Sequence, residues 1–305
     1  MAQAISSTPY LASPEDYVAL MKPRVMSLVI FTAVIGVLLS PMTTHPVLMV
    51  ISVLAIAAGA GASGAINQWY DRDIDAQMER TANRPIPLGR VHPDEALSLG
   101  LIISVLSVLV LGFAGGFKAA AMLAFTIVFY GLIYTVWLKR STTQNIVIGG
   151  AAGAFPPVIG WLAAGGDFGL EPLVLFLIIF AWTPPHFWAL ALVRNDDYRR
   201  VGVPMFPVVH GFAATKNQIL VYAVIVAIVG VIPAFIGMAG LAYLVLAAGL
   251  GIRFLMLSVA LWRSDDADMK TPMALFRFSI LYLFLVFLGL GLDVGLAAIW
   301  TGYGT

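Results

Sequence analysis

Nine long apolar segments take up most of this chain and restrict what it can fold into. Each has close to the roughly 20 residues that cross a bilayer as an α-helix. They lack the polar alternation of barrel strands, so we predict an all-α, multi-pass transmembrane bundle of about nine helices. The segments are 25–41, 46–69, 96–117, 119–138, 146–164, 172–193, 219–240, 241–262 and 275–300.

Composition and domain organisation agree with a membrane protein. Of the 305 residues, 60% are hydrophobic and 11% are charged, whereas soluble domains have about 25% charged residues. We expect a short N-terminal tail at residues 1–24 and one transmembrane domain at 25–305, with no large domain outside the membrane. The start of the tail lacks the basic cluster and apolar core of a signal peptide.

Two further features exclude whole classes of function. The chain has no cysteine, which rules out disulfides, thiolate metal sites and cysteine nucleophiles. Its formal net charge of +1 argues against nucleic-acid binding, which needs a strong basic excess. Any chemistry must use oxygen and nitrogen groups.

The basic residues cluster on one side of the predicted bundle. Of 17, Lys118 falls on the opposite side and Arg253 inside a span. Basic loops stay cytoplasmic, so we predict a cytoplasmic N-terminus, an outside C-terminus and, in a bacterium, the inner membrane. The other fifteen are Lys22, Arg24, Arg72, Arg80, Arg84, Arg90, Lys139, Arg140, Arg194, Arg199, Arg200, Lys216, Arg263, Lys270 and Arg277.

The first acidic loop carries Asn67, Asp71 and Asp75 at steps of four residues. On an α-helix this spacing puts three oxygen ligands on one face. Like charges so placed repel one another, and a hard cation between them removes that penalty. We predict a Mg²⁺ site, since Mg²⁺ prefers oxygen ligands and shares them with substrate phosphates. The alternative is a solvated amphipathic loop.

Arginine and lysine residues lie close to this loop in the sequence. Arginine forks bind diphosphate oxygens and neutralise a departing charge, although positive-inside anchoring also accounts for these residues. The candidates for binding diphosphate are Arg80, Arg84, Lys139, Arg140, Arg199 and Arg200.

The second acidic loop follows the sixth span and contains Asn195, Asp196 and Asp197. Adjacent acids cannot share a helix face as an i, i+4 pair does. We expect Asp196 and Asp197 to help bind metal if the helix end is irregular, with a solvated turn as the alternative. A weak repeat of two four-helix halves would place the two loops face to face.

His186 lies inside the sixth apolar segment, just after a pair of prolines. A lone buried histidine is often a hydrogen-bonded core residue, but an ionisable group within the membrane is also a functional candidate. Of the side chains in this sequence, the imidazole of histidine is the one well suited to bind heme iron. Both roles remain open, and we name His186 as the candidate heme-binding residue.

Taken together, these motifs resemble the UbiA-type superfamily, the membrane prenyltransferases of quinone and heme synthesis, and in particular its heme branch. The superfamily pattern Asn-x3-Asp-x3-Asp is matched by Asn67, Asp71 and Asp75. One departure is that the Asp-x3-Asp of quinone-branch second loops is replaced by Arg194 and Tyr198. The heme-branch matches are Met78-x-Arg80-Thr81, Tyr134-Thr-x-x-Leu-Lys139-Arg140, Gly153-x-x-Pro156-Pro157, Trp182-Thr-Pro-Pro-His186-Phe-Trp188, Asp197-Tyr198-Arg199 and Gly202-x-Pro204-Met205.

The resemblance implies an activity and its substrates. It implies Mg²⁺-dependent transfer of a farnesyl group from farnesyl diphosphate to the 2-vinyl group of heme b, with water addition giving heme O. It further implies that Tyr198 belongs to the catalytic set with the acidic residues, that membrane lipid surrounds the site, and that a heme A synthase or oxidase-assembly protein is a partner.

Two rivals remain at this point. A sister prenyltransferase acting on an aromatic acid or on another substrate of the quinone and chlorophyll branches would share the metal loop but would need no axial histidine. A transporter or oxidase-assembly scaffold would leave two acidic loops without a ligand to neutralise them.

Overall fold

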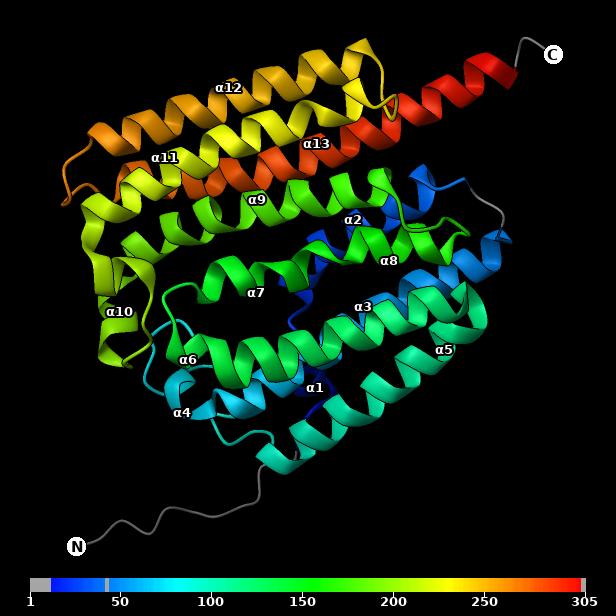
Figure 1. Cartoon of the computed structure of the whole chain (residues 1–305). Coiled ribbons are helices and arrows are strands. Elements are labelled where there is room, and N and C mark those ends of the chain that lie inside the picture. The colour runs from blue at the N-terminus through cyan, green and yellow to red at the C-terminus, as the bar shows by residue number, and fades with distance from the viewer. Residues whose placement is uncertain (1–11, 42–43, 303–305) are drawn as a thin grey trace, which may run out of the picture.

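The computed structural model describes residues 12–41 and 44–302, and in this part of the chain all regular structure is helical (Figure 1). The helices are α1 (Pro14–Leu20), α2 (Pro23–Leu39), α3 (Pro46–Tyr70), α4 (Arg72–Asp75), α5 (Pro93–Val128), the π-helix η1 (Phe129–Leu138), α6 (Lys139–Ser141), α7 (Asn145–Ala154), α8 (Pro156–Ala163), α9 (Leu170–Val193), α10 (Asn195–Arg200), α11 (Phe206–Phe235), α12 (Leu241–Arg263) and α13 (Lys270–Gly302).

The helices account for the number of membrane crossings. Seven helical stretches among the described residues are long and apolar enough to span a bilayer, and α1 with α2, bent by 57°, makes an eighth. One stretch, 93–141, turns at Gly116, whose φ of 82° is left-handed and suits glycine. Figure 1 shows the chain reversing there, which divides this stretch into two crossings and gives the nine segments expected from the sequence.

The N-terminal tail contains structure that the sequence analysis did not predict. Helix α1 packs against α3, and Leu20 has no exposed surface where it meets Ala65 and Val91. An apolar contact of this kind stabilises a short helix that would be marginal alone. Residues 1–11 of the predicted tail lie outside the described residues.

Helix α11 begins well before the apolar segment predicted at 219–240. Its first turns carry polar residues, but Lys216 is buried and donates to the carboxylate of Asp266 at 2.6 Å and to the carbonyl of Ser264 at 2.8 Å. Because the ammonium group is paired, its burial is tolerated. The helical run that carries Lys216 begins after a break within α11 at Gly211, whose φ is 79°.

Small residues of α7 bring neighbouring helices into close contact. A Cβ atom added at Gly149 would lie 2.1 Å from the ring of Tyr134, and one at Gly150 would lie 2.8 Å from Thr183. Glycine therefore lets η1 and α9 approach α7.

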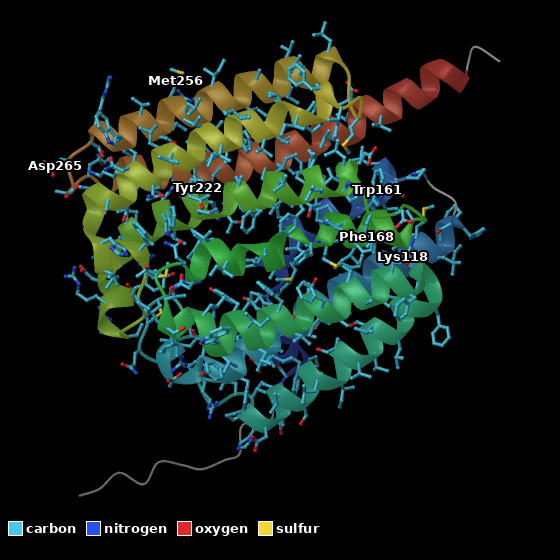
Figure 2. The ribbon with its side chains drawn as sticks, in the orientation of Figure 1. Lys118, Trp161, Phe168, Tyr222, Met256 and Asp265 are labelled. Atoms are coloured by element: carbon cyan, nitrogen blue, oxygen red, sulfur yellow. The ribbon has the colours of Figure 1, made fainter. Side chains whose placement is uncertain are left out.

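Helix α9 lies inside the bundle, and the loops that carry the candidate residues gather at one end. It contacts α7, α8, α11 and α13, and Figure 1 shows it between these helices. The short helices α4, α6 and α10 lie at the same end of the bundle. Figure 2 shows Asp265 at that end and Lys118 and Phe168 at the opposite end.

Candidate active site

Asn67, Asp71 and Asp75 form the centre of the candidate site, and all three are buried. Helix α3 ends at Tyr70, yet the amide of Asp71 donates to the carbonyl of Asn67 at 3.0 Å and that of Asp75 to the carbonyl of Asp71 at 2.8 Å. These i→i−4 bonds preserve helical spacing across the break between α3 and α4. The predicted clustering of the three side chains is therefore compatible with the local backbone.

Protein cations lie against each of these three side chains. Lys139 and Arg140 form ion pairs with Asp71, and Arg84 forms one with Asp75. The ammonium of Lys22 donates to Oδ1 of Asn67. Ion pairing thus offsets the repulsion that the spacing predicted, and the same cations would offer donors to an anionic ligand.

From the sequence, Lys22 is only one of the basic residues that place the N-terminus in the cytoplasm. It lies at the bend between α1 and α2 with a φ of 53°, a left-handed conformation that non-glycine residues seldom adopt. This bend sends its side chain past Gly64, whose added Cβ would contact the Lys22 stem at 3.6 Å. The rare backbone conformation brings a cation from the first span to Asn67.

The π-helix η1 supplies another contact that the sequence analysis missed. Asn67 donates through Nδ2 to Thr135 Oγ1 at 3.1 Å and to Asp71 at 2.7 Å. The Thr135 hydroxyl in turn donates to the carbonyl of Tyr130, five residues earlier, at 2.8 Å. This i→i−5 reach follows the π register, and Thr135 and Lys139 therefore meet Asn67 and Asp71 respectively.

Asp73 differs from its neighbours in the same motif because it is exposed. Arg140 donates to both of its carboxylate oxygens at 2.7 Å. These hydrogen bonds hold the pKa of Asp73 below its usual value. Asp73 therefore helps to orient Arg140 and lies outside the buried centre.

The two acidic loops meet in space, as the weak repeat predicted. Arg194 forms an ion pair with Glu79 at 3.6 Å, which joins the second loop to the first. An apolar cluster lies beside this pair and fixes Tyr198 against the first loop. The cluster consists of Ile74, Met78, Ile146, Ala191, Tyr198, Val203 and Met205.

Adjacent residues of the second loop have different environments. Asn195 and Asp197 are buried on α10, whereas Asp196 is exposed. Successive residues on a helix point about 100° apart, so only one of the two acids faces the protein interior. The structure thus buries Asp197 and leaves Asp196 exposed.

The remaining predicted basic residues are less closely engaged. Arg80 and Arg199 are exposed, and Arg200 is an exposed residue 3.7 Å from Asp197. Of the six predicted diphosphate-binding residues, the structure brings Arg84, Lys139 and Arg140 to the carboxylates of the first loop.

Buried oxygen atoms without hydrogen-bond partners are candidate ligands for a cation. Buried oxygens of Asp71, Asn145, Asn195 and Asp197 have no hydrogen-bond partner among the described residues. Unpaired buried oxygens are costly, and a hard cation is the ligand that suits them. No three His, Cys, Asp or Glu side chains in this part of the chain gather around one point, so amide or substrate oxygens must complete such a site.

His186 lies on α9, seven residues or about 10 Å along the axis before the end of that helix at Val193. Its ring is stacked between Trp182, at 4.2 Å between ring centroids, and Phe276, at 4.7 Å. Its Nδ1 atom lies 2.6 Å from Ser279 Oγ. The residue is therefore a hydrogen-bonded core histidine, one of the two roles that the sequence left open, and this does not exclude the other.

Comparison with known proteins identifies the family. The sequence model of the UbiA prenyltransferase family matches residues 29–281. The chain belongs to this family. A UbiA-family relative from Rhizobium rhizogenes, named protoheme IX farnesyltransferase, is 58% identical over 95% of this chain and 92% of its own length. The UbiA assignment makes the chain an integral membrane prenyltransferase.

Solved structures confirm the UbiA fold. One, from work on digeranylgeranylglyceryl phosphate synthase, has a TM-score of 0.76 at 18% identity and covers 92% of this chain and 98% of that chain. A UbiA homolog from Archaeoglobus fulgidus bound to DMAPP and Mg²⁺ has a TM-score of 0.69 at 16% identity, covering 90% of this chain and 99% of that chain. At these identities the likeness shows the fold.

Proposed function

We propose that this prenyltransferase moves the farnesyl group of farnesyl diphosphate to the 2-vinyl group of heme b, with water addition giving heme O. The observation that carries the proposal is the buried pair Asp71 and Asp75, lined by lysine and arginine side chains at one end of an apolar bundle. The 58% identical relative named protoheme IX farnesyltransferase supports the choice of substrates.

Mg²⁺ fits the oxygen atoms of this site. Asn67, Asp71 and Asp75 from the first loop and Asn195 and Asp197 from the second would hold it. Mg²⁺ keeps few protein ligands and takes the rest from phosphate and water. When bound, it would neutralise charge on the diphosphate oxygens. The A. fulgidus homolog, bound to DMAPP and Mg²⁺, supports this choice of ion.

The protein's own cations bind and stabilise the leaving group. Arg84, Lys139 and Arg140 are held beside the carboxylates by ion pairs. Such preorganised charges stabilise a developing anion without further reorganisation. The farnesyl C–O bond breaks, its electron pair leaves with the diphosphate, and an allylic cation remains within the apolar bundle.

The acceptor supplies the nucleophile, so no protein nucleophile is required. The vinyl π-bond forms the new carbon–carbon bond and passes the positive charge to the carbon next to the porphyrin. Water adds there and releases one proton, which leaves the hydroxyethylfarnesyl side chain. The chain's lack of cysteine is compatible with this route.

We further propose that the site faces the cytoplasm at a bacterial inner membrane. The basic residues lie in the loops at this end, and basic loops stay inside. An apolar product such as heme O remains in the bilayer, so a heme A synthase or oxidase-assembly protein would collect it there.

Mass spectrometry tests the proposed reaction. Purified protein is incubated with heme b, farnesyl diphosphate and Mg²⁺, and we expect a heme heavier by one farnesyl group and one hydroxyl group. A chelator should abolish the product and added Mg²⁺ should restore it. Turnover of an aromatic acid in place of heme would move the protein to the quinone branch, and turnover of neither would favour the scaffold.

A further inference from the structure

The surroundings of His186 hold its ring in one orientation. The rings of Trp182 and Phe276 cover its two faces at interplanar angles of 18° and 23°. Trp182 Nε1 also donates to the carbonyl of Ser279 at 2.7 Å, which ties the stacking residue on α9 to α13. His186 is therefore clamped between two helices rather than free to rotate.

The protons of this network determine the histidine tautomer. Ser279 Oγ donates its single proton to the carbonyl of Phe276 at 2.6 Å. The same oxygen lies 2.6 Å from His186 Nδ1, so it has no second proton to donate and must accept. Nδ1 therefore carries the hydrogen of a neutral ring, and Nε2 keeps a lone pair.

Nε2 is left available for a ligand. It forms no hydrogen bond within residues 12–41 and 44–302, and it is not one of the fully buried side-chain atoms that lack a partner, so it is open to a ligand. Histidines that bind metals usually donate their other ring N–H to a neighbouring oxygen, which fixes the tautomer and the ring orientation. Ser279 Oγ occupies the place of that oxygen.

We infer that Ser279 is a positioning residue for heme, which holds His186 as the Nδ1–H tautomer so that Nε2 binds the heme iron. The inference deepens the proposed function, because it takes heme b as the substrate. Iron ligation would hold the porphyrin at His186, about two helical turns from the end of α9, beyond which the second acidic loop begins. Ser279 touches no reacting atom and acts through His186.

A heme titration without farnesyl diphosphate tests the inference. Ferric heme is added to the purified full-length protein, and its Soret band and EPR signal report the axial ligand. We expect a histidine-type spectrum in the wild type, its loss in His186→Gly, and its recovery when imidazole is added. Ser279→Ala should weaken heme binding about tenfold, the lower end for loss of a residue that orients a metal ligand.

Matched variants separate positioning from general damage. Ser258 is also fully buried, and its hydroxyl donates to the carbonyl of Phe254 at 2.9 Å on α12. Ser258→Ala should leave the heme affinity and spectrum unchanged. Trp182→Phe keeps an aromatic ring and removes the bond to Ser279, so it should weaken heme binding in the same direction as Ser279→Ala.

The outcomes distinguish this inference from the proposed function. An identical heme spectrum in the wild type and His186→Gly overturns iron ligation, even if the wild type still makes heme O. Unchanged heme affinity and spectrum in Ser279→Ala overturn the positioning role. A histidine-type spectrum in protein that does not farnesylate heme would leave the inference standing and remove the proposed function.

Discussion

The ammonium group of Lys139 lies against the carboxylate of Asp71, whose side chain has no exposed surface. The two residues are 68 positions apart, and they meet because Lys139 directly follows η1 and Asp71 directly follows α3. Removing one partner of a buried ion pair leaves the other charge without compensation. This pair holds Lys139 beside the proposed position of the diphosphate.

The first prediction contrasts two acids of one motif. Asp71→Asn should lower the rate of farnesyl transfer at least about a hundredfold, comparable to the loss of a preorganised charge-stabilising group. Asp73→Asn should change the rate by less than about fivefold, because an exposed ion pair contributes about 0–1 kcal/mol. Product formation measured by mass spectrometry checks both. Equal rates in the two variants would contradict the assignment of the buried centre.

The sequence predicted the grouping of one acidic motif because helical spacing is a local property. Asn67, Asp71 and Asp75 were grouped from their i, i+4 steps, and the structure buries all three. The nine apolar segments were recognisable because bilayer thickness sets their length. These predictions needed no knowledge of how the helices pack.

Other features depend on packing and were not predictable. Asp196 and Asp197 are equivalent in sequence, and the orientation of α10 decides which of them is buried. Thr135 looks like an ordinary residue of an apolar span, and the π register of η1 turns it toward Asn67. Ser279 resembles a small packing residue until α9 is placed beside α13.

The second prediction concerns Thr135. Thr135→Val keeps the side-chain shape and removes the acceptor for Asn67 Nδ2, a hydrogen bond worth about 0.5–1.5 kcal/mol. We expect farnesyl transfer to slow by about two- to tenfold. Thr126→Val is the control, since the Thr126 hydroxyl donates only to the carbonyl of Met122 on α5, at 2.7 Å. A comparable loss of rate in both variants would assign the effect to helix stability.

The third prediction concerns packing of α8 against α2. A Cβ atom at Gly160 would lie 2.2 Å from the carbonyl oxygen of Ala33, whereas one at Gly153 would have no neighbour within 4 Å. Gly160→Ala should lower the free energy of unfolding by about 1–3 kcal/mol through overpacking. Gly153→Ala should leave it nearly unchanged. Thermal unfolding in detergent measures both, and a stable Gly160→Ala variant would show that the two helices can separate at little cost.

The last prediction tests which end of the bundle faces the cytoplasm. Because the chain has no cysteine, a single introduced cysteine gives an unambiguous labelling signal. Asp265 and Phe168 are exposed at opposite ends of the molecule (Figure 2). With a membrane-impermeant maleimide on intact cells, Phe168→Cys should be labelled, and Asp265→Cys only after the membrane is permeabilised. The reverse pattern would place the acidic loops outside and overturn the cytoplasmic location. The basic residues beside these loops would then be an exception to the positive-inside rule.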